Sequence, residues 1–394
     1  MPLVSVGTIG GGPPARVDPV GTVQPPGAGW TLEWWIGADD RWRLPANEVA
    51  VRQHRVGDAP VVETAMRVPS GDAIHRVYGA AGDGAPIVIE VENASPAPFV
   101  LALVMRGAGQ VAVDGVTARI DRQFALTTPR APSRWATTTA APVQLPVTTG
   151  HAQTGPFPGA RDRGARLEVA LLHPVAHRTT LRAVMTMGRH APAVDPRSVA
   201  DADDVARGWE RLLDRALRVE LPSEALAARV QAARAEVLLA GQGRAPGAAV
   251  FTALEDWGFD AETMVVWRRL TARERQVVRS RATPGTWAEA EALADDGEFL
   301  VAVRRLLVND TPNGPVDLLT ELPAAWRGEP LAVHDAPITG GTVSYAVRWH
   351  GPRAAVLWET TASGLTLRLP ALDPEWSTTE ARGEALFDVA ERRT

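Results

Sequence analysis

The sequence predicts a multidomain α+β protein built from three consecutive parts. Strand-length apolar runs fill the first two hundred residues, apolar residues then recur with helical spacing, and strand-like alternation returns near the end. We therefore expect a large N-terminal antiparallel β-sandwich over residues 1–200, a short α-helical middle over 201–312 and a small C-terminal β-domain over 313–394. A chain of 394 residues is long enough for two or three hydrophobic cores.

The N-terminal part is rich in valine, threonine, proline and glycine. Turn-forming residues separate its apolar runs, and Gly115 lies between two of them, which predicts a tight hairpin. Many short strands at this spacing indicate a sandwich. The expected strands are Pro60–Val68, Pro86–Asn93, Pro98–Met105, Gln110–Asp114, Thr117–Asp121, Arg166–Leu172 and Thr179–Met185.

The helical part begins where the period of the apolar residues changes. Aspartates around position 201 suit the start of a helix that runs toward Leu217. A second helix starts at Ser223 and ends at Gly241. Phe251–Leu270 then reads as a helix, a one-glycine stop and an immediate second helix.

The last helical stretch starts at Thr286, where Thr286 and Glu289 have the spacing of a capping box. We expect it to run toward Leu307 with an interruption around Gly297. At ordinary lengths, residues 201–310 leave room for about four to six helices.

The C-terminal part alternates again. Thr342–His350 and Ala354–Glu359 flank a turn at Gly351, and Leu365–Leu369 forms a third strand. We expect Thr378–Thr394 to form a short charged helix or a loose tail.

Composition excludes several classes of function. A net charge of -5 offers no basic surface for nucleic acid. The absence of cysteine excludes disulfides, a thiol nucleophile and thiolate metal sites. All 41 basic residues are arginine, which fits codon bias in a GC-rich genome. No signal peptide and no membrane-length apolar run is visible, so a cytoplasmic protein is expected.

Two helical segments carry a resemblance to a known family. Arg218–Leu239 resembles the entry helix that follows the sandwich in six-hairpin glycosidases of the glucoamylase and α-rhamnosidase type. Ala253–Leu270 is similar to one of their repeating hairpins, and the order of the three parts is the same. The resemblance implies an α/α toroid, here incomplete because a closed ring needs about twice the helices that fit. The loop Gly241–Phe251 also lacks the carboxylate that usually holds the sugar in that family.

The resemblance turns attention to the acidic residues of the hairpin. Glycoside cleavage needs two carboxyl groups on opposite sides of the scissile bond. Glu255 and Asp256 are the catalytic candidates, beside Trp257, whose indole can stack on a sugar. A structural role at the helix end stays open for both acids. Capping and the helix dipole account for Asp260 and Glu262, and a turn or a cap accounts equally well for Asp295 and Asp296.

A dense tryptophan cluster near the N-terminus offers a second set of candidates. If this segment is a strand, Trp34 and Trp35 point to opposite faces, so that one lies in the core and the other is exposed or covered. Trp34, Trp42 and Arg41 are candidate sugar contacts through ring stacking and bidentate bonds. Packing of the sandwich against the helices is the more frequent use of such residues.

Cofactors are not expected. His173 and His177 have Pro174 between them, which excludes helical metal-ligand spacing. No Gly-x-Ser-x-Gly motif occurs, and the glycines of Gly10–Gly12 lack the lysine of a phosphate loop.

Three functions therefore remain, the third of which is an intracellular regulator unrelated to sugars. The first is a glycosidase-like protein that recognises or hydrolyses carbohydrate in a cleft between sandwich and helices. The second is a non-catalytic relative that binds glycan or acts as a structural partner. An incomplete toroid exposes apolar helix faces, so the second function predicts a homo-oligomer or another stable partner.

Overall fold

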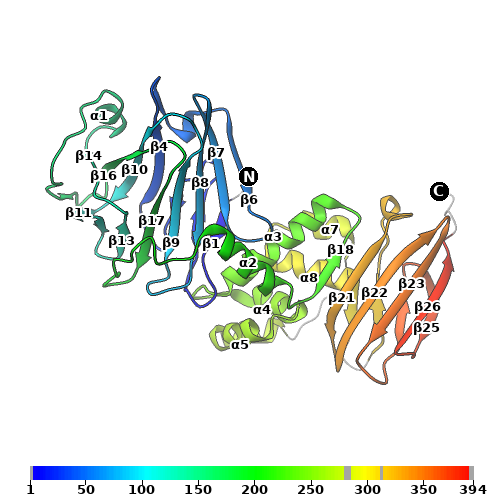
Figure 1. The fold of residues 1–394 in the computed structure, drawn as a ribbon. Coiled ribbons are helices and arrows are strands. Elements are labelled where there is room, and N and C mark those ends of the chain that lie inside the picture. Colours follow the sequence, from blue (N-terminus) through cyan, green and yellow to red (C-terminus); the bar gives the residue numbers. More distant parts are fainter. Residues whose placement is uncertain (1–2, 279–284, 311–313, 390–394) are drawn as a thin grey trace. The chain divides into compact units, whose positions relative to one another are not determined.

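The computed structural model describes residues 3–278, 285–310 and 314–389 (Figure 1). The chain divides into two compact units, Met1–Trp209 and Glu210–Thr394. The described residues form an α+β protein with eight α-helices and four sheets, in which β20 and β24 are the only parallel neighbours. The helical and C-terminal segments fall in one unit. The three-part division expected from the sequence stays a prediction, and its 312/313 boundary lies outside the described residues.

Unit 1 contains two large antiparallel sheets. The first, in spatial order, consists of β1 (Val4–Val6), β2 (Ala15–Val17), β3 (Val23–Gln24), β4 (Thr31–Gly37), β10 (Phe99–Ala108), β16 (Leu167–Val175) and β14 (Arg134–Thr138), with β5 (Trp42–Arg43) paired to β4. The second consists of β15 (Ala160–Arg161), β11 (Gln110–Asp114), β12 (Thr117–Ile120), β13 (Phe124–Thr127), β17 (Thr180–Met187), β9 (Ile87–Asn93), β8 (Gly71–Gly79), β7 (Val62–Val68) and β6 (Val51–Arg55).

Some of these strands show alternating burial, whereas β9 and β16 are buried on both faces over most of their length. Along β7, every second side chain is buried, as expected for a strand with one face on a core. The expected hairpin at Gly115 is confirmed, because β11 pairs with β12 and Gly115 has φ of 55°, in the left-handed region that glycine tolerates. One buried cluster takes side chains from both sheets, among them Trp34, Leu103 and Ile89.

A second buried cluster lies on the other face of β4. Trp34 belongs to the core shared by the two sheets, whereas Trp35 packs with Ala102, Val147 and other residues near α1 (Gln144–Thr148). The opposite orientation of the two indoles is therefore as expected. Trp35 is covered within its own unit, and both rings are at most 2% exposed.

The described residues between 202 and 307 form seven helices, more than the four to six expected, because α6 and α7 are short. The helices are α2 (Ala202–Leu213), α3 (Glu224–Ala240), α4 (Gly247–Asp256), α5 (Asp260–Arg269), α6 (Ala272–Val278), α7 (Trp287–Ala292) and α8 (Asp296–Leu307). Within unit 2, α8 packs against α3, α4 and α7.

The helix boundaries follow the capping residues. Ser223 caps α3, and Thr286 with Glu289 forms the expected capping box at α7. The break before α8 is set by Asp295, whose side chain accepts from the backbone N–H of Glu298. Asp260 corrects one expectation: it occupies the first turn of α5 and Phe259 is the N-cap, which has no side-chain cap bond.

Unit 2 also contains two smaller sheets. The five-stranded sheet has β18 (Arg218–Glu220), β21 (Leu331–Ile338), β22 (Gly341–His350), β23 (Arg353–Thr360) and β26 (Arg382–Asp388) in spatial order. The four-stranded sheet has β19 (Val308–Asp310), β20 (Val316–Leu318), β24 (Leu367–Leu369) and β25 (Asp373–Thr378). Short 3-10 turns lie at Pro45–Asn47 and Ala324–Trp326.

The expectation for the C-terminal segment was wrong. Residues 382–388 form β26, a strand that pairs along its length with β23, and neither a helix nor a loose tail. Phe387 and Gly383 face a buried aromatic cluster, which gives the segment the two-residue period of a strand. None of the helices in the described residues has the length and apolar character needed to cross a bilayer.

Candidate functional site

Unit 2 contains a cavity of about 650 Å³. It lies among α4, α5 and the junction of α8 with β19, and it combines aromatic, acidic and basic side chains. This volume falls in the range of small-molecule sites. The residues that line it are Phe251, Thr252, Glu255, Asp256, Thr263, Met264, Trp267, Val278, Arg304, Arg305, Val308, Asn309 and Asp310.

The hairpin between α4 and α5 positions the two acidic candidates. Gly258 has φ of 83°, and the N–H of Phe259 bonds back to the carbonyl of Leu254 at 2.9 Å, which ends α4 tightly. Glu255 and Asp256 therefore occupy the last turn of α4, where Glu255 is exposed and Asp256 is half-buried. The sequence placed both residues together, and the structure brings both to the cavity.

Arg304 holds the polar side of the cavity together. This side chain is 2% exposed, and its Nε donates to the backbone carbonyl of Asp256 at 3.2 Å. It also donates to the carbonyls of Val308 and Pro337 and lies 3.7 Å from the Asp310 carboxylate. One buried guanidinium thus joins α4, β19 and β21, which fixes the backbone around the site.

Asp310 contributes the third carboxylate of the cavity. Its Oδ2 accepts from the backbone N–H and the hydroxyl of Thr339, at 3.3 and 3.2 Å. Asp310 is therefore anchored to the loop after β21 as well as paired with Arg304.

An aromatic wall forms the apolar side. The rings of Phe251 and Trp267 lie 5.1 Å apart at an angle of 47°. The guanidinium of Arg275 lies 4.9 Å from the centre of the Trp267 ring, and its NH2 donates to the Trp267 carbonyl at 3.1 Å. The half-buried indole is thereby held in place with part of its surface on the cavity.

Trp257 does not reach this cavity. Its ring has no exposed surface, and its indole N–H donates to the carbonyl of Leu300 at 3.0 Å. Burial in the packing between α4 and α8 leaves no ring face for a ligand.

Trp34 is also buried, inside unit 1. Its ring is 2% exposed and stacks on His75 with 4.8 Å between centroids and an interplanar angle of 6°. The indole N–H donates to the carbonyl of Val20 at 3.0 Å. Trp34, which was expected to contact a sugar, is therefore a core residue of unit 1.

Trp42 and Arg41 lie together on the surface of unit 1. Trp42 is half-buried and its ring covers Gly37, where a Cβ would lie 2.8 Å from the ring. Arg41 forms two hydrogen bonds with Glu48, one of them 2.9 Å long, and these bonds together with its positive charge lower the pKa of Glu48. The guanidinium is thus engaged by a carboxylate, while part of the indole remains accessible.

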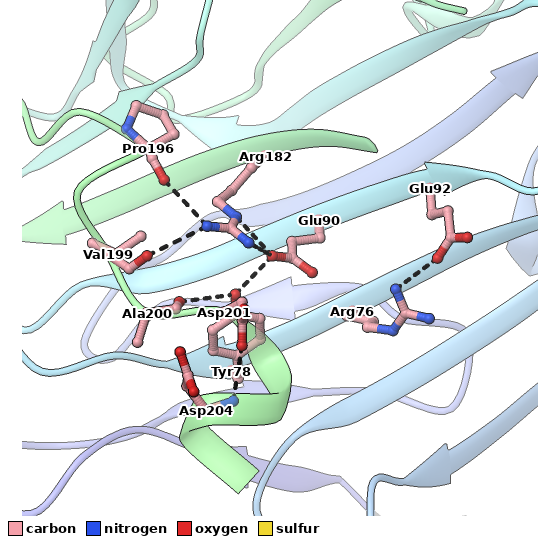
Figure 2. A network of polar contacts seen from close by, with 10 residues as sticks. All are labelled: Arg76, Tyr78, Glu90, Glu92, Arg182, Pro196, Val199, Ala200, Asp201 and Asp204. Carbon is pink, nitrogen blue, oxygen red and sulfur yellow. Dashed lines mark hydrogen bonds and ion pairs between the residues drawn. The ribbon is translucent and has the colours of Figure 1, made fainter. Parts of the chain in front are cut away.

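Polar residues also gather on the outer face of the nine-stranded sheet (Figure 2). Tyr78 donates its hydroxyl to Glu90 at 2.7 Å, and Arg182 binds the same carboxylate oxygen at 2.6 Å. Arg182 also donates to the carbonyl of Val199 at 3.3 Å. The Tyr78 hydroxyl lies 3.2 Å from the carbonyl oxygen of Ala200. Glu90 is 4% exposed. This network fastens the segment before α2 to the sheet. These contacts of Tyr78, Glu90 and Arg182 are all with other residues of unit 1.

Sequence reasoning missed Trp267, Phe251, Asp310 and Arg304. Trp267 follows Thr263 by one helical turn, so the spacing places both on one face of α5, but it does not mark that face as part of a cavity. Asp310 and Arg304 carried no such signal, because tertiary packing brings them to α4. Within the described ranges, no group of three or more His, Asp or Glu side chains is placed to hold a metal ion.

Comparisons with known proteins assign neither a family nor a function to this chain. No protein-family model matches the chain, and a search of curated proteins found no significant match.

Proposed function

We propose that the cavity of unit 2 binds a carbohydrate. The observation that carries this proposal is the presence of an aromatic wall, Phe251 with Trp267, and several hydrogen-bonding side chains in one cavity of about 650 Å³. Sugars present apolar C–H faces that pack on aromatic rings and hydroxyl groups that need donors and acceptors.

The charges around the cavity favour a neutral hydroxylated ligand over an ion. Three carboxylates and two guanidiniums line it, so neither sign is in large excess. Carboxylates accept from hydroxyl groups, while Arg305 and the amide of Asn309 supply donors. A strong anion or cation would meet repulsive groups as well as attractive ones.

Recognition is supported better than hydrolysis. Glu255 and Asp256 are consecutive residues on one helix, and consecutive helical positions do not face each other. Asp310 comes from another element but is anchored by Thr339 and Arg304. A cleavage mechanism needs an acid and a second carboxylate on opposite sides of the bond, so hydrolysis would require Asp310 to act together with Glu255 or Asp256.

Kinship with six-hairpin glycosidases remains part of the proposal. The α4–Gly258–α5 hairpin supports it, as does the core shared by the two large sheets, which favours the sandwich interpretation of unit 1. The proposed binding site lies entirely within unit 2 and requires no cleft between the units.

The first experiment is a glycan-array screen of the purified chain, followed by calorimetric titration with the oligosaccharide that binds best. Trp267→Ala is expected to weaken binding by about tenfold or more, because aromatic contacts of this kind contribute on the order of 1 kcal/mol or more. Asp256→Asn is expected to weaken it by a smaller factor.

Trp42→Ala is the matched control, since it removes a half-buried indole from unit 1. Loss of binding in Trp42→Ala with full binding in Trp267→Ala would move the site to the surface of unit 1. Release of reducing sugar by the wild-type chain that disappears in Glu255→Gln and Asp256→Asn would establish hydrolysis instead of recognition alone.

A further inference from the structure

The last strand of unit 2 has one side without a neighbour. β26 pairs with β23 along seven residues and is the outermost strand of the five-stranded sheet. In the described part of the chain, no strand pairs with its other side and no further backbone hydrogen bond reaches it. Unpaired N–H and C=O groups of this kind form a template for another strand.

The edge is held firmly by aromatic packing behind it. Phe387 is 6% exposed and lies 5.5 Å from the ring of Trp376, which lies 5.3 Å from Trp358. At Gly383 a Cβ would lie 2.5 Å from the Trp358 ring, so only glycine lets the strand lie this close to the indole. The backbone of β26 is therefore ordered before any partner arrives, which lowers the entropic cost of association.

The charges along β26 are self-complementary. Arg382 and Asp388 stand at its two ends, both exposed and on the same face. An antiparallel pairing of β26 with an identical strand, centred on Ala385, uses all seven residues. It places Arg382 of each copy directly opposite Asp388 of the other, where opposite charges attract.

The neighbouring strand extends this pattern. β23 places Arg353 opposite Asp388 and Glu359 opposite Arg382. In the paired arrangement, a row across the sheet reads Arg353 and Asp388 from one copy, then Arg382 and Glu359 from the second. The signs alternate at every step, and the two-fold axis generates a second such row.

The other long edge strands of the described residues do not offer this match. Self-pairing of β6 places Arg52 opposite His54, which supplies no negative charge to pair with the arginine. β25 contains Pro374, which has no N–H to donate. β14 is covered, because Trp135 bridges to Gln153.

We propose that β26 pairs antiparallel with β26 of a second copy of this chain and continues the five-stranded sheet across a two-fold axis. Exposed apolar side chains join the contact: Leu357 is 43% and Leu386 is 50% exposed, and Leu357 is opposite Glu384. In the dimer, Glu384 also faces Leu386 of the second copy. Leu357 and this Leu386 therefore lie on either side of the Glu384 side chain and can pack on its methylene groups. A single strand edge buries little area, so the expected dimer is reversible, with a dissociation constant in the micromolar range.

Sedimentation equilibrium of the full chain tests this pairing, over concentrations from about 5 µM to about 300 µM. Arg382→Glu places a carboxylate opposite Asp388 in both rows and is expected to raise the dissociation constant at least about tenfold. Asp388→Arg alone is expected to do the same. The double variant Arg382→Glu with Asp388→Arg restores opposite charges across the interface and is expected to recover the dimer.

Arg52→Glu, on the edge strand β6, is the matched control and is expected to leave the dissociation constant unchanged. Circular dichroism of each variant establishes that it is folded. A wild-type chain that stays monomeric through the whole range overturns the proposal, and so does a dimer that both single charge reversals leave intact. Neither result bears on carbohydrate binding in the cavity, which uses other residues.

Discussion

The outer face of the nine-stranded sheet and the cavity of unit 2 both gather carboxylates and arginines, but the surroundings of these groups differ. On the sheet, Glu90 is 4% exposed and binds Tyr78 and Arg182, which in turn hold backbone carbonyls of the segment before α2. In the unit 2 cavity, Glu255 is exposed in the last turn of a helix beside an aromatic wall. Glu90 is therefore buried among its partners, whereas Glu255 lies exposed at the lining of a cavity.

Two tryptophans separate packing from binding most sharply. Trp257→Ala is expected to lower the free energy of unfolding by about 4 kcal/mol, because a fully buried indole is lost and the Leu300 carbonyl loses its donor. Trp267→Ala, at a half-buried ring, is expected to cost about 1–2 kcal/mol. Urea unfolding followed by far-ultraviolet circular dichroism measures both. Equal losses of unfolding free energy in the two variants would mean that Trp267 is a core residue, as Trp257 is.

Acid is expected to weaken the interior of unit 1. Burial lowers the pKa of His75 to about 3 and that of His173 to about 4, so both are neutral in the folded chain. The unfolded chain binds these protons near pH 6.5, so their full contribution is present above that pH and is lost as the pH falls toward the folded values. For His75 the loss is roughly 3 kcal/mol at pH 4.

His75→Phe isolates this effect, because it keeps a flat ring against Trp34 and removes the titrating group. The variant is expected to show a flatter dependence of unfolding free energy on pH between about 4 and 6.5. A profile parallel to that of the wild type would show that His75 is not the group responsible.

Glu90 and Glu92 lie on one strand and differ in burial, which makes them a matched pair. Glu90→Gln is expected to destabilise unit 1 by about 2 kcal/mol, because the buried Arg182 pair and the Tyr78 bond lose their charged acceptor. Glu92→Gln removes a more exposed pair with Arg76 and is expected to cost at most about 1 kcal/mol. Thermal unfolding of the two variants compares them, and a larger loss in Glu92→Gln would contradict this assignment.

Local signals explain the parts of the fold that the sequence predicted. The capping box at Thr286, the cap at Ser223 and the stop at Gly258 each depend on residues within one helical turn. The hairpin at Gly115 and the opposite faces of Trp34 and Trp35 follow from the geometry of strands. The position of Glu255 and Asp256 at a helix end was predicted for the same reason, because it depends on local sequence.

The parts that were missed depend on distant partners. Residues 382–388 are charged and short, and their strand conformation depends on pairing with β23 and on packing against Trp358. Asp310 reaches the cavity only because β19 follows α8 and Arg304 links it to α4. The burial of Trp257 likewise requires the position of α8, which the hairpin motif does not contain.

We propose that the unit 2 cavity binds a sugar through its aromatic wall. Calorimetric titration of the best array ligand into wild type, Trp267→Ala and Trp42→Ala is the decisive measurement. Saturable binding by wild type and Trp42→Ala, with at least about tenfold weaker binding by Trp267→Ala, is the predicted result. Absence of heat from every glycan with the folded wild-type chain, or equal affinity in Trp267→Ala, would contradict it.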